Sequence, residues 1–349
     1  MMKRQQQGFN LIEVFIALAV GLALLSGVLS VFIGMRITTS ETSSFGELQE
    51  NGRFAISVLS DDILKQNFFG ELNAPMDAFL LRTSPTSADI ATDCTGDGVN
   101  NATFPVAVGT FRTLWGKTAA SASEMGCIDD AKVGSDIVQL KRTIASPIAV
   151  PNPAAAVGDA DRFYLLANVN EGEIFVGNTV PANINDIDDA QIWQYQHHVY
   201  YVTEESQGDN TVPVLRQGRL TSEGMDFDVL VEGIESIRFM YGVDTDLDAD
   251  TTDYFGGEGD GIVDTFIAAD DMTSALWSNN ASRILAVKIF VLARDILPDL
   301  NYENNNTYIM GSDSAGADVV IEGGGDNYRR LLFTTTVTLF NAREDKWPP

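Results

Sequence analysis

The sequence has 349 residues, of which 49 are Asp or Glu and 22 are Lys or Arg, so the formal net charge at pH 7 is −27. A surface this acidic repels nucleic acid and anionic lipid, so we expect no direct nucleic-acid contact. The length is sufficient for a large globular head with its own core. No internal repeat or long low-complexity tract is visible.

The first element in the chain is an apolar segment. Residues 14–35 are 22 consecutive residues without a charge, and about 20 apolar residues cross a bilayer core as a helix. A secretory signal peptide has an apolar core of roughly 7–15 residues and a small-residue cleavage site behind it, which this segment does not match. Because Lys3 and Arg4 precede it, we expect a single pass through the inner membrane with the rest of the chain exported.

Glu13 stands alone at the start of this apolar segment. A carboxylate at such a position costs a few kcal/mol and is usually functional and paired. An interfacial Glu that reaches the lipid headgroups is the simpler alternative.

The residues around Glu13, Gly8-Phe9-Asn10-Leu11-Ile12-Glu13, resemble the prepilin signature of type IV pilins and type II secretion pseudopilins. The resemblance implies that residues 1–8 are a leader, that a prepilin peptidase cleaves between Gly8 and Phe9, and that the Phe9 amine is methylated. Residues 9–35 then form the transmembrane and filament-core helix. Opposite charges in an apolar medium attract strongly, so Glu13 of one subunit would neutralise the Phe9 amine of a neighbour and set the register between their helices.

The helix is predicted to continue over residues 36–68, which contain no proline. Apolar residues recur at spacings of seven and four, which places them on one face that would dock on the head. This stripe comprises Leu48, Ala55, Leu59 and Ile63. Acidic residues expected to remain in water are Glu47, Glu50, Asp61 and Asp62. Gly70 and Pro75 are the predicted stop signals.

Several motifs together resemble those of PilW-type minor pilins of the type IV pilus. They are Leu48–Ala55, Asp62-Ile63, Phe68-Phe69-Gly70, Gly134–Val138, Val231–Glu235, Tyr241–Asp246 and Arg329–Val337. The family often has a Cys directly after the Phe-Gly pair, and here Glu71 follows Gly70. Any disulfide built from that position is therefore absent.

The remainder, residues 69–349, reads as an exported β-rich head, in which 70–131 could be an inserted lobe. Short runs rich in Val, Ile, Tyr and Phe are separated by Gly, Asn, Asp and Pro, which is typical of strands and turns. The predicted strands are 136–142, 162–167, 192–203, 227–241, 284–293 and 331–340. No strand–helix–strand rhythm is visible, so we expect two antiparallel sheets packed on the helix. The predicted fold class is α+β, a lollipop with a long N-terminal helix and a sheet-rich head, as in type IV pilins.

Cys94 and Cys127 are the only cysteines. In an exported head they should form a disulfide, and closing that loop would stabilise the fold by about 3–4 kcal/mol. Two buried free thiols are the alternative.

One loop is strongly acidic and suits a hard cation with oxygen ligands. If calcium binds there, the predicted ligands are Asp244, Asp246, Asp248, Asp260 and Asp264. The loop fails the EF-hand template, because Ala249 replaces the turn glycine and Phe255 replaces the bidentate Glu. A solvated acidic hairpin tip is the alternative. Asp93, Asp97 and Asn100 are a weaker second candidate.

No enzymatic motif is convincing, and we predict that the chain is not an enzyme. The only histidines, His197 and His198, are adjacent on a predicted strand and point to opposite faces, so they cannot hold one metal together. Gly116-Lys117-Thr118 lacks the glycine and the strand–helix setting of a phosphate loop.

Two classes of function follow. In the first, the chain is a minor pilin that joins or primes a type IV pilus and so supports twitching motility and adhesion; a type II secretion pseudopilin is its sibling. Its partners would be other minor pilins, the major pilin, the prepilin peptidase and the assembly platform. It would lie in the inner membrane with a periplasmic head before assembly and in the extracellular pilus afterwards. In the second class the head is a tip adhesin with a calcium-stiffened loop.

Overall fold

The structure of the protein is a computed structural model. It describes residues 10–72, 76, 81–83, 85, 90–107, 109–148, 156–208, 210–245, 260–278 and 283–342. The chain divides into two compact units. The first ends at Glu47 and holds the apolar part of the N-terminal helix; the second begins at Leu48 and holds the head.

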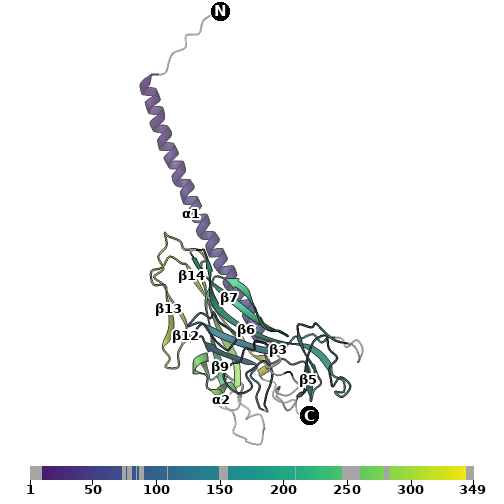
Figure 1. The fold of residues 1–349 in the computed structure, drawn as a ribbon. Helices are drawn as coiled ribbons and strands as arrows, with labels where there is room; N and C mark the ends of the chain where they lie inside the picture. Colours follow the sequence, from purple (N-terminus) through teal and green to yellow (C-terminus); the bar gives the residue numbers. More distant parts are fainter. Residues whose placement is uncertain are drawn as a thin grey trace, which may run out of the picture. The chain divides into compact units, whose positions relative to one another are not determined.

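Helix α1 (Leu11–Leu64) has 54 residues and is labelled in Figure 1. Within the described residues it is the one helix long and apolar enough to cross a membrane. The large apolar side chains between Leu11 and Met35 are all exposed, by 49–85 % of their surface. Because this part of the helix is apolar on every side, its surface suits lipid or other apolar helices rather than water.

The helix ends through a short run of backbone turns. Asn67 and Gly70 take left-handed conformations, with φ of 60° and 68°, and such residues commonly terminate helices. A side chain at Gly70 would overlap the ring of Trp193, so this position also requires glycine for space. The Asn341 amide donates at 2.9 Å to the carbonyl of Gln66, in the turn that follows the end of α1 at Leu64.

The larger sheet of the head has eight strands, and its backbone path runs β1-β5-β4-β6-β3-β2, with β7 added to β6 and β8 to β7. The strands are β1 (Leu81–Thr83), β2 (Leu114–Thr118), β3 (Asp136–Thr143), β4 (Phe163–Ala167), β5 (Gly172–Val176), β6 (Gln191–Gln207), β7 (Asn210–Thr221) and β8 (Gly224–Glu232). All pairs are antiparallel except β1 with β5. The long strand β6 pairs with β3, β4 and β7 and organises the sheet.

The second sheet has four antiparallel strands in the order β10-β9-β11-β14. They are β9 (Ile234–Asp244), β10 (Thr265–Ala268), β11 (Arg283–Arg294) and β14 (Arg330–Thr338). A separate hairpin is formed by β12 (Thr307–Ser312) and β13 (Asp318–Glu322). Short helical segments are η2 (Ala269–Asp271), α2 (Ser274–Trp277) and η3 (Phe340–Ala342).

The predicted strand over 227–241 is in fact two strands in two different sheets. Strand β8 pairs with β7 in the larger sheet, whereas β9 pairs with β11 in the smaller one. Only Gly233 separates them, and its φ of 76° supplies the change of direction. The prediction of one strand was therefore wrong, because a single left-handed glycine is enough to move the chain between sheets.

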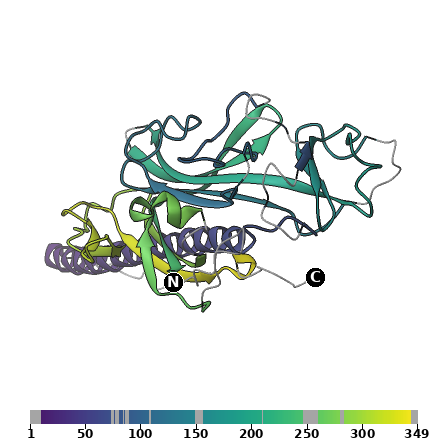
Figure 2. The same cartoon turned by 90° about the horizontal axis from the view of Figure 1, so that it is seen from below.

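The main core unites the end of α1 with both sheets (Figure 2). The predicted stripe on the helix is confirmed, since Leu48 is 2 % exposed and Ala55, Leu59 and Ile63 are fully buried. Gly52 lies in the same part of α1, and the ring of Phe333 occupies the space that a side chain there would take. The helix therefore packs directly on β14.

Ser135, which directly precedes β3, and Asp136, its first residue, join the two sheets at the centre of the head. The Ser135 hydroxyl bonds the backbone of Ile237 in β9. One carboxylate oxygen of Asp136 accepts the Phe239 N–H at 2.7 Å, and the other accepts the Thr118 hydroxyl at 2.7 Å. Burial raises the pKa of Asp136 to about 7, against the opposing effect of these hydrogen bonds.

The predicted α+β architecture, with mainly antiparallel sheets, is confirmed. Strands β3, β4, β6, β11 and β14 lie within a few residues of their predicted ranges. Short or polar strands were not predicted; they are β1, β2, β5, β7, β10, β12 and β13.

Candidate functional site

The start of α1 holds the one charged side chain of the apolar segment. Glu13 lies in the first turn of the helix, and its Oε2 accepts the Asn10 N–H at 3.1 Å. This bond satisfies a backbone donor that a helix N-terminus leaves free. Glu13 is thus turned towards the end of the chain at which cleavage is predicted. Gly8 and Phe9 lie outside the described residues.

The other end of α1 carries a buried charge cluster on the head. Asp62 is only 4 % exposed. One of its oxygens accepts the guanidinium of Arg142 in β3 at 2.6 Å, and the other accepts His198 Nδ1 at 2.6 Å and the Tyr200 hydroxyl at 2.7 Å. Gln217 of β7 donates in turn to the Tyr200 hydroxyl at 2.6 Å. Three strands of the larger sheet are therefore tied to one helical carboxylate.

Electrostatics explain why Asp62 stays ionised. Burial alone would raise its pKa, but the attraction of His198 and Arg142 and the hydrogen bonds from His198 and Tyr200 outweigh burial and hold the pKa of Asp62 far below its usual range. The expectation that Asp62 remains in water was wrong. Its neighbour Asp61 is exposed and pairs with Lys65, so one step along the helix separates a solvated carboxylate from a buried one.

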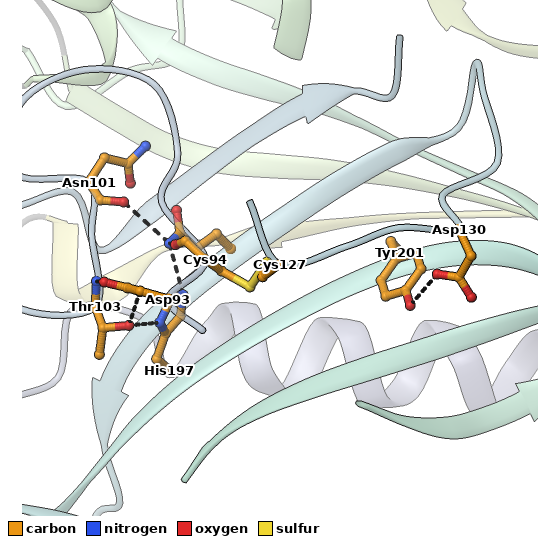
Figure 3. The surroundings of a disulfide bond; sticks show 9 residues. Asp93, Cys94, Asn101, Thr103, Cys127, Asp130, His197 and Tyr201 are labelled. Carbon is orange, nitrogen blue, oxygen red and sulfur yellow. Dashed lines mark hydrogen bonds between the residues drawn. A yellow bond between two sulfur atoms is a disulfide. The ribbon is translucent and has the colours of Figure 1, made fainter. Parts of the chain in front are cut away.

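The predicted disulfide between Cys94 and Cys127 is present, and a chain of buried polar groups lies against it (Figure 3). Gln139 Nε2 donates to the Cys94 carbonyl at 3.0 Å and to His197 Nε2 at 2.8 Å. His197 Nδ1 lies 2.8 Å from the Thr103 hydroxyl, which bonds Asp93 at 2.5 Å. The consistent direction of donation is Gln139 to His197, His197 to Thr103, and Thr103 to Asp93.

This chain of groups ties Asp93 and Thr103 to strands β3 and β6 and is closed to substrates. Burial, and then the nearby Lys141, hold the pKa of His197 well below its usual range, so the ring is neutral. His197 and Thr103 are fully buried, so no substrate reaches the hydroxyl. His197 faces this chain while His198 faces Asp62, which confirms that the two histidines point to opposite sides of β6.

The acidic loop is described in part. Asp244 ends β9 and is fully buried; its Oδ2 accepts the Gly261 N–H at 2.9 Å, while its Oδ1 has no hydrogen-bond partner among the described residues. Asp264 accepts both the N–H and the hydroxyl of Thr245, and Asp260 accepts the Ile262 N–H. Asp246 and Asp248 lie outside the described residues. Within the described residues no three acidic, His or Cys side chains form a metal-binding group.

The weaker cation candidate near Cys94 is not supported by its geometry. The Asp93 carboxylate is committed to Thr103. The Asn100 side chain accepts the N–H groups of Val106 and Ala107 and donates to two carbonyls, so it closes its own loop. Those two side chains hold backbone and hydroxyl groups instead of a free coordination site.

The comparisons with known proteins match the C-terminal part of the head. Residues 199–341, which run from within β6 through β14, match the model of the family described as Type IV Pilus-assembly protein W. No curated protein and no solved structure matches the chain significantly. The family match supports a PilW-type assignment.

Proposed function

From this PilW-type assignment to a pilus-assembly family, we propose that the chain is a minor pilin of the type IV pilus. It is held in the inner membrane by α1, is processed at Gly8–Phe9 and enters or primes the filament through helix packing. Its partners are the major pilin, the other minor pilins, the prepilin peptidase and the assembly platform. This role contributes to twitching motility and adhesion through the pilus.

The observation that carries the proposal is the exposed, apolar surface of α1 between Leu11 and Met35, in which Glu13 is the single acid. Such a helix is unstable in water and needs lipid or other helices around it. Gly21, Gly27 and Gly34 have no atom within 4 Å of the side-chain position. These three positions leave room for another helix to approach closely.

Glu13 provides the specificity of that packing. Cleavage after Gly8 would leave a cationic amine on Phe9 in an apolar setting, and a buried charge is strongly penalised unless it is paired. The carboxylate of Glu13 from a neighbouring subunit neutralises this amine in one axial register. Wrong registers leave both charges unpaired, so the pair selects the offset between subunits.

The mass of the chain recovered from cells tests the processing step. We expect a mature chain that begins at Phe9 with one methyl group on its amine. A chain that retains residues 1–8 while pili form normally would contradict the proposal.

A deletion strain separates assembly from adhesion. Loss of surface pili supports an assembly role, whereas normal pili with lost attachment support the tip adhesin. A normal pilus together with a defect in protein secretion points to the pseudopilin alternative.

A calcium-binding role of the acidic loop is a second candidate, favoured by one observation. Asp244 is fully buried with one carboxylate oxygen unpartnered among the described residues, and such an oxygen is costly without a donor or cation. Asp244, Asp246, Asp248, Asp260 and Asp264 are the proposed ligands. Millimolar calcium should raise the melting temperature of the wild type but not of Asp244→Asn; no shift in the wild type argues against the site.

A further inference from the structure

A cavity of about 430 Å³ lies between the outer edge of β2 and the segment formed by η2 and α2. Trp115 and Trp277 line it, with ring centroids 6.4 Å apart. A second cavity of about 270 Å³ shares Arg112 and Ser274 with the first. The pilin role described above uses neither cavity.

Arg112 is the unusual residue of this cleft. It is 4 % exposed, and its Nη2 donates to the Ser274 carbonyl and to the hydroxyls of Ser274 and Ser278 at 3.1–3.3 Å. Its Nη1 donates to the Asp97 carbonyl oxygen, and its Nε has no hydrogen-bond partner in the part of the chain that the structure describes. Among the described residues, no carboxylate forms an ion pair with it, although the chain has 49 acidic residues.

The contrast with two other enclosed arginines is informative. The side chains of Arg142 and Arg330 are 10 % and 5 % exposed, and each contacts a carboxylate directly. Burial lowers the pKa of Arg112, with the negative field of Asp97 in opposition. A buried guanidinium held only by carbonyl and hydroxyl oxygens leaves part of its desolvation cost uncompensated, and an entering carboxylate would remove it.

A second basic residue, Lys141, lies behind Arg112. Lys141 is fully buried, and its Nζ donates to the Arg112 carbonyl at 2.9 Å and to Asn101 at 3.1 Å. Burial, together with Arg112, holds the pKa of Lys141 well below its usual range, and Asp93 opposes this only in part. Of the acids that line the larger cavity, Asp97 contributes its carbonyl and Asp270 accepts the Thr118 N–H at 2.9 Å.

The wall of the cavity is a strand edge. In the larger sheet β2 has β3 on one side and is the last strand of the path. The Thr118 N–H points outward, to Asp270, and backbone groups two residues apart on a strand point to the same side. The N–H and C=O of Gly116 therefore point along the cavity, where an extended chain could bond them.

We propose that this cleft binds the carboxyl-terminal end of an extended peptide. The terminal carboxylate pairs with Arg112, the peptide backbone follows the edge of β2 at Gly116, and an apolar side chain packs on Trp115 and Trp277. Strand addition supplies hydrogen bonds, while the carboxylate contact restricts binding to chain ends.

Matched peptides test the proposal on the full chain in detergent, with tryptophan fluorescence as the readout. The probes are acetyl-Ala-Val-Leu with a free carboxylate, the same peptide with a terminal amide, and acetate. We expect the acid peptide to bind at least tenfold more tightly than the amide and far more tightly than acetate. Equal binding of acid and amide, no binding of either, or acetate binding as tightly as the peptide would overturn the proposal.

Variants locate the binding to Arg112. Arg112→Gln should remove the preference for the acid peptide, and Arg112→Lys should keep part of it. Arg219→Gln is the control, because Arg219 is a half-exposed β7 residue paired with Asp228, away from the cleft; it should bind as the wild type does. A folded Arg112→Gln protein that keeps the full preference contradicts the assignment. If that variant does not fold, the comparison of acid, amide and acetate on the wild type decides alone.

Discussion

The ring of Phe333 in β14 occupies the space beside Gly52 in α1 that any side chain at that position would need. This contact joins the helix to the smaller sheet, within a core that also contains Leu48, Ala55 and Leu59. A glycine in a helix is otherwise unfavourable by about 0.5–1 kcal/mol relative to alanine. The close approach of the strand to the helix is the physical reason for it.

Replacing Gly52 by alanine should destabilise the head despite the gain in helix propensity. The new methyl group overlaps the Phe333 ring, and such overpacking typically costs about 1–3 kcal/mol. The free energy of unfolding, measured by urea titration in detergent, should fall.

The same helix offers a matched control at Gly46. No atom lies within 4 Å of its side-chain position, so Gly46→Ala should be neutral or stabilising by up to about 1 kcal/mol. Adding Phe333→Leu to Gly52→Ala should recover part of the lost stability. A Gly52→Ala protein as stable as Gly46→Ala would show that the contact with Phe333 is not tight.

Asp62→Ala should be among the most destabilising single changes in the head. It leaves Arg142 buried without its carboxylate and removes the acceptor for His198 and Tyr200. Breaking a buried pair on one side typically costs about 3–5 kcal/mol.

Asp61→Ala, one residue earlier, is the matched control for that change. It removes only an exposed pair with Lys65 and should change stability by less than about 0.5 kcal/mol. Comparable losses for the two variants, measured by the same urea titration, would be inconsistent with the buried cluster.

The head should lose stability as the pH rises from about 4 to about 7, through Asp136. Because its folded pKa is raised to about 7 from 3.8, the folded state keeps a proton that the unfolded state releases over this window. The loss is about 4 kcal/mol at most, at 1.36 kcal/mol for each unit of pKa. Asp62 has a lowered pKa in the folded state and therefore the opposite pH dependence. Its contribution to stability is present above about pH 4 and is lost only as the pH falls below that value.

Asp136→Asn isolates this effect. The amide can still accept the Phe239 N–H and can donate to the Thr118 hydroxyl, so the two sheets remain joined. Stability measured at pH 5 and pH 8 should differ less in the variant than in the wild type. A variant with an unchanged pH difference would indicate that Asp136 ionises normally in the folded protein.

Reduction of the disulfide should destabilise the wild type by about 3–4 kcal/mol, because Cys94 and Cys127 close a loop of 33 residues. The Cys94→Ala/Cys127→Ala double variant should have the midpoint of the reduced wild type and should not respond to a reducing agent. If reduction leaves the unfolding midpoint of the wild type unchanged, this expectation is contradicted.

The sequence was sufficient to predict the parts of the fold that depend on periodic apolar residues. The stripe from Leu48 to Ile63 and the opposite directions of His197 and His198 follow from spacings along one element, and both are confirmed. The spacing of residues along one helix contains no information about which polar group on a distant strand will contact that helix. Asp62 was therefore expected to be exposed, although it lies 80 residues before Arg142 and bonds it.

The short strands, and the passage of the chain between the two sheets at Gly233, could not be predicted because they too depend on contacts with distant parts of the chain. Strands β12 and β13 alternate weakly, and β7 contains Pro213. The peptide cleft was missed because Arg112, Gly116 and Trp277 become neighbours only through the pairing of β2 and the placement of α2. The available signal was that Arg112 lies in a stretch, residues 98–123, that contains no Asp or Glu.

The amount of the chain in sheared pili of a Glu13→Gln strain tests most directly the proposal that Glu13 makes this chain a filament subunit. The variant loses the negative charge but keeps the shape of the side chain. We expect it to reach the membrane and to be cleaved to begin at Phe9, yet to be absent from the pili. Recovery of Glu13→Gln in sheared pili at the wild-type level would contradict the account.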